Sequence, residues 1–150
     1  MMKKLALAML LCCSTASHAA PEPDAFFRAV SVNNASGVRS MLADGMNPNQ
    51  ADTQRGDIPL VLALRDDADK VFKLLLDTPG IDIEARSANG NTALMMAAYK
   101  HKQAAVEALL AKGAKVNQSG WTAAQFAQAG DKPGVVAIIE AAQKARAGRK

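Results

Sequence analysis

The sequence of 150 residues is poor in the side chains from which most catalytic and metal centres are made. It has two cysteines and two histidines, and aromatic residues make up 4% of it. Both cysteines, Cys12 and Cys13, lie close to the N-terminus, in a segment that we interpret as a removable leader. Once that segment is removed, His101 is the one histidine left. Ordinary structural zinc sites, Cys/His nucleophiles and thiol redox pairs are then excluded.

Residues 1–19 have the order of a secretory signal peptide. Two lysines precede an apolar run at 5–13, and small residues follow it. This run is too short to cross a hydrocarbon core about 30 Å thick, so we expect cleavage after Ala19 rather than a membrane anchor. We expect no lipoprotein, because Leu11 stands before Cys12, where lipidation signals have a small residue. The sequence therefore predicts export to the periplasm of a bacterium, with outright secretion as the alternative.

The formal net charge of +4 is unevenly distributed. Two lysines belong to the leader, and four basic residues lie in 144–150, which we expect to be a solvated basic tail. Residues 20–143 carry 12 basic and 14 acidic side chains. The net positive charge therefore gives little support for nucleic-acid binding, and we expect none.

No sequence motif of a known catalytic or phosphate-binding site occurs. The chain contains no G-x-S-x-G, H-E-x-x-H or P-loop string. Asp66, Asp67 and Asp69 form an acidic cluster, but it lacks the glycine and the closing glutamate of an EF-hand loop. We expect Asp67 to serve a turn of the backbone and Asp69 to cap the helix that follows. The sequence thus predicts no catalytic residue, no metal site and no cofactor.

A small residue recurs at a regular interval through the rest of the chain. Ala29, Ala63, Ala97 and Ala127 are 34, 34 and 30 residues apart, and an apolar cluster ends about thirteen residues after each. Periods near 33 residues are typical of stacked two-helix units. One such unit cannot bury its own apolar face and must pack against its neighbours.

The unit over residues 90–117 shows the pattern most fully and resembles an ankyrin repeat. Thr92-Ala93-Leu94 stands where that family has T-P-L, Ala97-Ala98 is its small pair, and residues 113–117 match its closing G-A-D-V-N. The resemblance extends over about 24–143. It implies a domain from 20 to 143 with repeats at approximately 22–55, 56–89, 90–119 and 120–143.

The fold that this resemblance implies is an all-α solenoid of about four helix-turn-helix repeats with short β-hairpin or loop tips. The turn between the two helices of a unit falls on Asn33, Asp67, His101 and Asp131. Asn, Asp and His are the non-glycine residues enriched at positive φ, so the turn accounts for His101 without catalysis. Glu140 occupies a slot that is apolar in the earlier repeats, and we expect it in an end repeat that caps a complete array.

By the same resemblance, the repeats present a concave surface for another protein, built from the tips and the exposed side of the first helices. The single tryptophan and the single tyrosine both fall on this surface, where aromatic and arginine side chains often dominate binding. Trp121 is equally compatible with folding back over the neighbouring repeat, and Tyr99 with a plain solvent-facing position. The candidate partner-binding residues are Gln54, Arg55, Asp57, Arg65, Asp66, Asn89, Asn91, Tyr99, Lys100, Ser119 and Trp121.

Three classes of function remain open at this point. The first is a scaffold or accessory factor for a periplasmic enzyme, and the second is an inhibitor or immunity protein that neutralises a toxin delivered to the periplasm. The third is a small-ligand binder, for instance of haem, through Met95, Met96 or His101, although packing and turn roles explain these residues more simply. We expect a monomer that binds a protein partner, without stable membrane insertion after signal cleavage.

Overall fold

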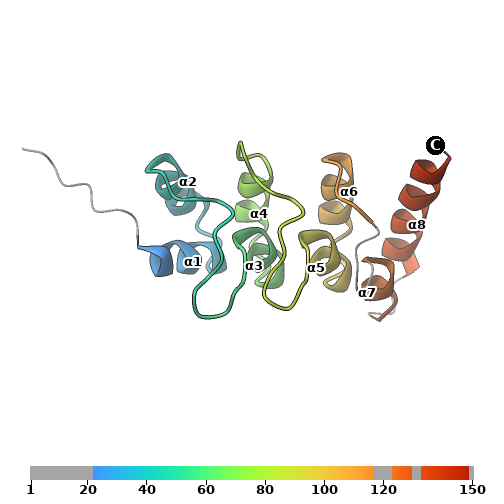
Figure 1. Cartoon of the computed structure of the whole chain (residues 1–150), viewed down its shortest axis with the longest axis horizontal. Coiled ribbons are helices and arrows are strands. Elements are labelled where there is room, and N and C mark those ends of the chain that lie inside the picture. The colour runs from blue at the N-terminus through green and yellow to red at the C-terminus, as the bar shows by residue number, and fades with distance from the viewer. Residues whose placement is uncertain (1–21, 117–122, 130–132, 149–150) are drawn as a thin grey trace, which may run out of the picture.

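The computed structural model describes residues 22–116, 123–129 and 133–148. These residues form eight α-helices and no β-strand, so the connections between repeats are loops. The helices pair in sequence order, and the pairs stack along the long axis of the molecule (Figure 1). The expected all-α solenoid is confirmed. The helices are α1 (Pro23–Ser31), α2 (Ala35–Ala43), α3 (Pro59–Arg65), α4 (Asp69–Leu76), α5 (Ala93–Tyr99), α6 (Gln103–Ala111), α7 (Ala123–Ala129) and α8 (Pro133–Ala147).

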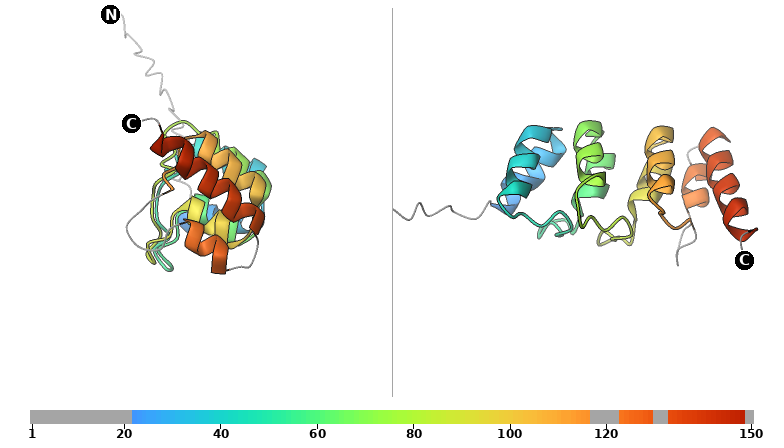
Figure 2. Two further views of the ribbon diagram at one scale, coloured as in Figure 1. Left: turned by 90° about the vertical axis from the view of Figure 1, so that its right-hand side faces the viewer. Right: turned by 90° about the horizontal axis from the view of Figure 1, so that it is seen from above.

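The helices form two layers. The first helices of the pairs, α1, α3, α5 and α7, lie in one layer and the second helices, α2, α4, α6 and α8, in the other (Figure 2). The long loops that connect α2 to α3 and α4 to α5 project together on one side of both layers (Figure 2). Side chains of neighbouring repeats therefore meet at equivalent places along the stack.

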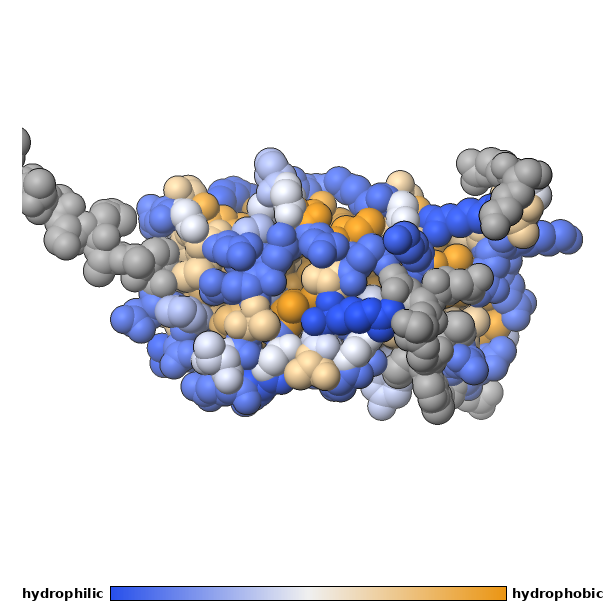
Figure 3. Space-filling view, viewed as in Figure 1, coloured by the Kyte–Doolittle hydropathy of each residue, from blue (hydrophilic) through white to orange (hydrophobic). Residues whose placement is uncertain are grey.

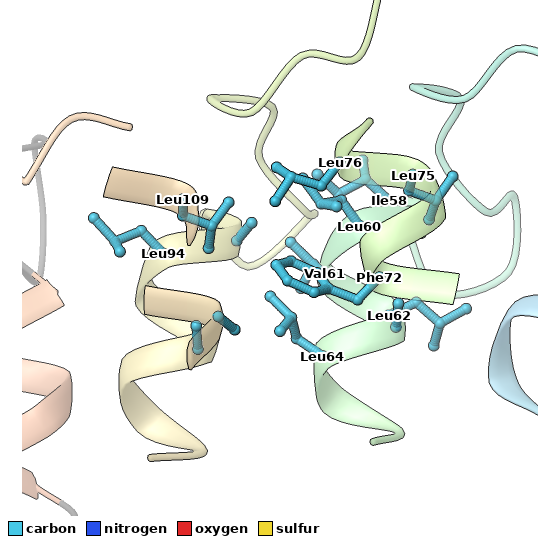
Figure 4. Close-up of a cluster of buried hydrophobic side chains, with 14 of the residues drawn as sticks. Ile58, Leu60, Val61, Leu62, Leu64, Phe72, Leu75, Leu76, Leu94 and Leu109 are labelled. Carbon is cyan, nitrogen blue, oxygen red and sulfur yellow. The ribbon is translucent and has the colours of Figure 1, made fainter. Parts of the chain in front are cut away.

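The core is shared between neighbouring repeats. In α4, Val71, Phe72, Leu75 and Leu76 recur at helical spacing and are at most 5% exposed. Figure 4 shows α3 and α4 beside the α5–α6 pair. Leu109 of α6 lies in one cluster with side chains of α3 and α4. Each helix pair thus depends on the next pair for the burial of its apolar face.

Small residues allow the first helices to lie close together. Ala63, Ala97 and Ala127 are fully buried, and α5 has a second buried alanine, Ala98. Their side chains end at Cβ, so α3, α5 and α7 can approach without a cavity between them. The regularly spaced alanines of the sequence therefore lie where neighbouring first helices pack against one another.

The turn within each of the first three pairs has the conformation that the sequence predicts. Asn33, Asp67 and His101 have φ angles of 57°, 58° and 55°. The amide N–H of the residue after each turn donates to the carbonyl of Ala29, Ala63 or Ala97, over 2.8–2.9 Å. Asp131, the fourth predicted position, lies outside the described residues.

Asn33 also caps a helix in the next repeat. Its side-chain Oδ1 accepts the backbone N–H groups of Lys70 and Val71, at 3.0 and 3.1 Å, in the first turn of α4. The expectation that Asp69 caps this helix is wrong: Ala68 is the N-cap residue, and Asp69 is the first residue of α4, with its carboxylate bound to Lys102 at 2.6 Å. Capping here joins two repeats rather than closing one.

The segment that was expected to be a basic tail is part of the last helix as far as the structure describes it. Helix α8 continues to Ala147, so residues 144–147 are helical, although Lys144 is exposed to solvent. Arg146 donates from its guanidinium to the carbonyls of Ala114, at 2.6 Å, and Leu110, at 3.5 Å. A cation at the C-terminal end of α6 is favourable because the last carbonyls of a helix lack partners and carry partial negative charge. Glu140 is exposed on α8, at a slot that is apolar in the earlier repeats.

We expect Leu75→Ala to destabilise the protein by about 2–5 kcal/mol. Leu75 is fully buried, and removing its side chain loses apolar burial and leaves a cavity in the shared core. Urea unfolding followed by circular dichroism measures the change. Val32→Ala is the control: that side chain is 72% exposed, so its loss should change the free energy of unfolding by less than about 0.5 kcal/mol. Equal effects of the two substitutions would contradict the assigned packing.

Substitutions of Asn33 separate its capping role from its turn role. Asn33→Gly keeps the positive φ but removes the cap, and we expect a loss of about 0.5–2 kcal/mol. Asn33→Asp retains an acceptor for the same amides and adds a negative charge at a helix N-terminus, so it should stay within about 0.5 kcal/mol of the parent. Thermal and urea unfolding measure both. A glycine variant as stable as the aspartate variant would show that the cap between repeats contributes nothing.

Candidate protein-binding surface

Two loops, residues 52–57 and 86–91, form the tips between the first three repeats, and each is closed by backbone hydrogen bonds. The Asp52 N–H donates to the carbonyl of Asp57 at 2.8 Å, and the Ser87 N–H donates to that of Asn91 at 3.0 Å. The side-chain carboxylate of Asp52 also accepts the N–H of Gln54 at 2.9 Å. The loops therefore hold defined shapes without β-strands.

The two loops are tied to one another. The N–H of Ala88 donates to the carbonyl of Gly56 at 2.8 Å. Gly56 has a φ of +65°, and a Cβ on it would lie 2.5 Å from the Cβ of Ala88. Both the backbone conformation and the close approach thus require glycine at this position.

Asp57, one of the candidate partner-binding residues, lies at the closed end of the 52–57 loop and is buried. Its side chain is 5% exposed and accepts from the Arg65 Nη1 at 2.6 Å. The Nε of Arg65 contacts Asp66 at 3.3 Å, and Asp66 in turn accepts from the Ser31 hydroxyl at 2.7 Å. Because its carboxylate is buried, Asp57 has a positioning role: it fixes Arg65 against the 52–57 loop. The chain of contacts continues across α3 to α1.

These carboxylates keep Arg65 charged. Burial by itself lowers the pKa of Arg65, but the hydrogen bonds and charges of Asp57 and Asp66 outweigh it. The net pKa is raised above the ordinary arginine value. The guanidinium is partly exposed, with 34% of the side chain accessible, and is therefore a fixed cation at the edge of the surface.

A cleft of about 280 Å³ lies beside the first loop. It has Phe27 and Leu62 as apolar walls, and Arg28 and Arg55 enter it from α1 and from the 52–57 loop. Neither arginine forms an ion pair within the described residues. The complete lining is Asp24, Phe27, Arg28, Ser31, Asp52, Gln54, Arg55 and Leu62.

Of the eight residues that line this cleft, Gln54 and Arg55 are candidates from the sequence, and the other six are not. Three of those six are charged, namely Asp24, Arg28 and Asp52. Asp24 and Arg28 are four residues apart and so share a face of α1, a signal that was available in the sequence. Asp52 had no such signal, because its position depends on how the loop folds back.

Lysines of the third repeat pair with aspartates of the second. Lys100 contacts Asp67 at 3.0 Å, and Lys102 contacts Asp67 at 3.1 Å and Asp69 at 2.6 Å. Hydrogen bonds from Lys100 and then Lys102 lower the pKa of the Asp67 carboxyl. Burial opposes the charge on Lys102, but Asp69 and Asp67 outweigh it and raise its pKa. Two members of the acidic cluster, Asp67 and Asp69, thus bind lysine ammonium groups of the next repeat, whereas Asp66 binds Arg65.

The candidate residues other than Asp57 fall into three groups. Gln54, Arg55 and Asn89 are exposed on the tips, and Asn91 is half-buried at the neck of its loop. Arg65, Asp66, Tyr99 and Lys100 lie at the ends of α3 and α5, and Tyr99 is 53% exposed. Ser119 and Trp121 lie outside the described residues. The face that carries the loops is largely hydrophilic, with hydrophobic residues between the polar ones (Figure 3).

The described residues provide no arrangement for a metal ion, since three or more His, Cys, Asp or Glu side chains nowhere converge among them. Within the same ranges, every helix is too short or too polar to cross a bilayer. Met95 is buried in α5, Met96 is partly buried on it, and His101 forms the following turn.

Comparison with known proteins agrees with the repeat architecture. A family model described as ankyrin repeats (3 copies) matches residues 79–147. The chain is 36% identical over 87 residues to human transient receptor potential cation channel subfamily A member 1, which covers 58% of the chain and 8% of the channel. It is 40% identical over 74 residues to human neurogenic locus notch homolog protein 4, over 49% of the chain and 4% of that protein. Human SH3 and multiple ankyrin repeat domains protein 2 is 38% identical over 78 residues, 51% of the chain and 4% of that protein.

Gly56→Ala tests whether the two loops hold each other in place. Gly56 and Gly80 both have positive φ, so alanine at either should cost about 1–2 kcal/mol in backbone strain. Only at Gly56 does the added Cβ also meet Ala88, which should add about 1–3 kcal/mol and displace the loop. Gly80→Ala, where no atom lies within 4 Å of the added Cβ, is the matched control. Urea unfolding and amide hydrogen exchange at Ala88 measure the difference; equal losses would show that the contact has no weight.

Proposed function

Because this chain belongs to the ankyrin repeat family and its repeats form a protein–protein interaction module, we propose that it acts in the periplasm as a non-catalytic scaffold or accessory factor. Its partner in this proposal is an enzyme of that compartment, and binding uses the surface formed by the loops and by the exposed edges of α1, α3 and α5. The observation that carries the proposal is the preformed geometry of that surface.

A preformed surface binds with a smaller loss of conformational entropy. Both loops are closed at the neck, and the bond between Ala88 and Gly56 ties one to the other. Ordering loops and side chains on binding costs free energy, so a surface that is already ordered retains more of its contact energy. This favours a binding role for loops that have no catalytic groups to position.

The side chains on this surface suit protein recognition. Arg28 and Arg55 enter a cleft with apolar walls, and Tyr99 exposes an aromatic ring in the third repeat. Arginine and tyrosine are enriched among the residues that dominate binding energy at interfaces. A partner that inserts side chains between the two arginines and covers Tyr99 would use all three.

The periplasmic assignment is supported by the order of residues 1–19, in which a charged start, an apolar run and small residues follow one another. Both cysteines lie in that segment, so a cleaved protein would contain no thiol to oxidise after export. N-terminal sequencing of the protein from a periplasmic fraction tests this, with a chain that starts at Ala20 as the expected result.

The scaffold role is tested by affinity capture with the mature protein as bait and a periplasmic extract of the encoding bacterium. An enzyme that remains active in the complex supports a scaffold. An enzyme or toxin that loses its activity at nanomolar affinity, about −12 kcal/mol, would identify an inhibitor or immunity protein instead. A haem titration with an unchanged absorption spectrum would remove the small-ligand alternative.

We expect the double substitution Arg55→Ala with Tyr99→Ala to weaken partner capture at least about thirtyfold, because one dominant interface residue contributes about 2 kcal/mol or more. Both side chains are exposed, so helicity and melting temperature should stay close to those of the parent. Arg39→Ala, on an exposed position of α2, is the control and should leave capture unchanged. Adding Trp121→Ala extends the test to the sequence-predicted tip. Full capture by all of these variants would place the partner on another face.

A further inference from the structure

The second helices are not equally well packed along the stack. The backbones of α2 and α4, and of α6 and α8, come within contact distance along more of their length than those of α4 and α6. The repeat spacing shows why. Two equivalent positions are large in α4 and α8 but small in α6. They are Val71 and Leu74 in α4, Ala105 and Ala108 in α6, and Val135 and Ile138 in α8.

A groove of about 300 Å³ occupies the space that these alanines leave between α4 and α6. Phe72 forms part of its floor; the residue is 3% exposed, and its ring points from α4 toward the α5–α6 pair (Figure 4). Three alanines of α6 form the other wall. The complete lining is Asp69, Phe72, Lys73, Lys102, Gln103, Ala104, Ala105 and Ala108.

The charges on the rim favour an anionic group next to the apolar floor. Lys102 is held by Asp67 and Asp69, which compensate its charge. The Gln103 amide donates to Glu107. Lys73 is exposed, and within the described residues its ammonium group has no ion-pair partner. One uncompensated cation thus stands beside a wall of phenylalanine and alanine.

We propose that this groove is a second docking site, separate from the loop surface, for a partner protein segment with one large apolar side chain and a neighbouring acidic residue. The apolar side chain buries against Phe72 and Ala108, where exclusion of water stabilises it. The acidic residue meets Lys73 at the rim. The groove lies in the layer of second helices, whereas the proposed loop surface uses the first helices, so the two sites can be occupied independently.

The test uses small peptides of defined chemistry and nuclear magnetic resonance. Acetyl-Phe-Asp-amide, titrated into the full mature protein to millimolar concentration, should shift the resonances of Ala104, Ala105 and Ala108. Acetyl-Phe-Lys-amide should bind at least threefold more weakly, because its cation meets Lys73. Lys73→Gln should bring the two peptides to similar affinity. Absence of shifts at the groove, or equal binding of both peptides to the parent protein, would overturn the proposal.

The matched substitution is Ala108→Leu, which restores the residue type of α4. It fills the groove, so it should abolish the peptide shifts while thermal stability rises or stays unchanged. Ala111→Leu, at an exposed position of the same helix, should leave binding intact. The Arg55→Ala with Tyr99→Ala variant should still bind the peptide, so failure of the loop surface and failure of this groove are distinguishable.

Two other occupants have their own signatures. Decanoate that shifts the groove resonances when the peptides do not would assign the groove to an acyl chain. A concentration-dependent dimer that disappears in Ala108→Leu would assign it to a second copy of the chain. If Ala108→Leu raises thermal stability and no peptide binds to the parent protein, the groove is only a gap in the packing between α4 and α6. Each of these three results overturns the proposal.

Discussion

The structure depends on one constraint, which is that a pair of helices this short cannot bury its own apolar face. Helices α3 and α5 have seven residues each, below the length at which isolated helices are stable in water. Burial therefore has to come from the neighbouring pair, and the polar contacts follow the same rule. Asn33 caps a helix one repeat away, and Arg146 reaches the end of α6. The stability of each unit is thus tied to the next, as expected for a one-dimensional stack.

The same constraint positions the loop surface. A loop that connects two pairs begins in one repeat and ends in the next, so stacking fixes both of its ends. Asn49 donates to the carbonyl of Gly80 at 2.8 Å and accepts from the N–H of Asp82, also at 2.8 Å. Glu84 accepts from the N–H of Lys115 at 2.7 Å. Each of these contacts joins two residues that lie about one repeat apart in the sequence. The tips are therefore ordered by the stack and not by strand pairing.

The sequence was sufficient for features that lie within one repeat. The alanine spacing and the turn residues predict the helix pairs, and Asn33, Asp67 and His101 have the predicted conformation. It was insufficient where the partner of a side chain depends on how a loop folds back or on the neighbouring repeat. Asp57 was expected on the binding surface, but how far its loop folds back over α3 decides whether its carboxylate is buried against Arg65. Likewise Asp69 has the right position for a cap, yet Lys102 of the next repeat competes for its carboxylate. Periodicity locates a residue within its unit, whereas its partner depends on the distance and rotation between units.

Between the second and third repeats, the layer of first helices and the layer of second helices contribute differently to the stacking. In the first layer, the buried alanines at positions 63 and 97 bring α3 and α5 together, and the Ala88–Gly56 bond joins their loops. The pairs of Lys100 and Lys102 with Asp67 add charge contacts at the turns. These contacts set the spacing of the two repeats, so α4 and α6 need not touch, and small residues at 105 and 108 leave a groove without loosening the stack. A change of volume in the second layer should then alter the groove while the loops keep their relative position.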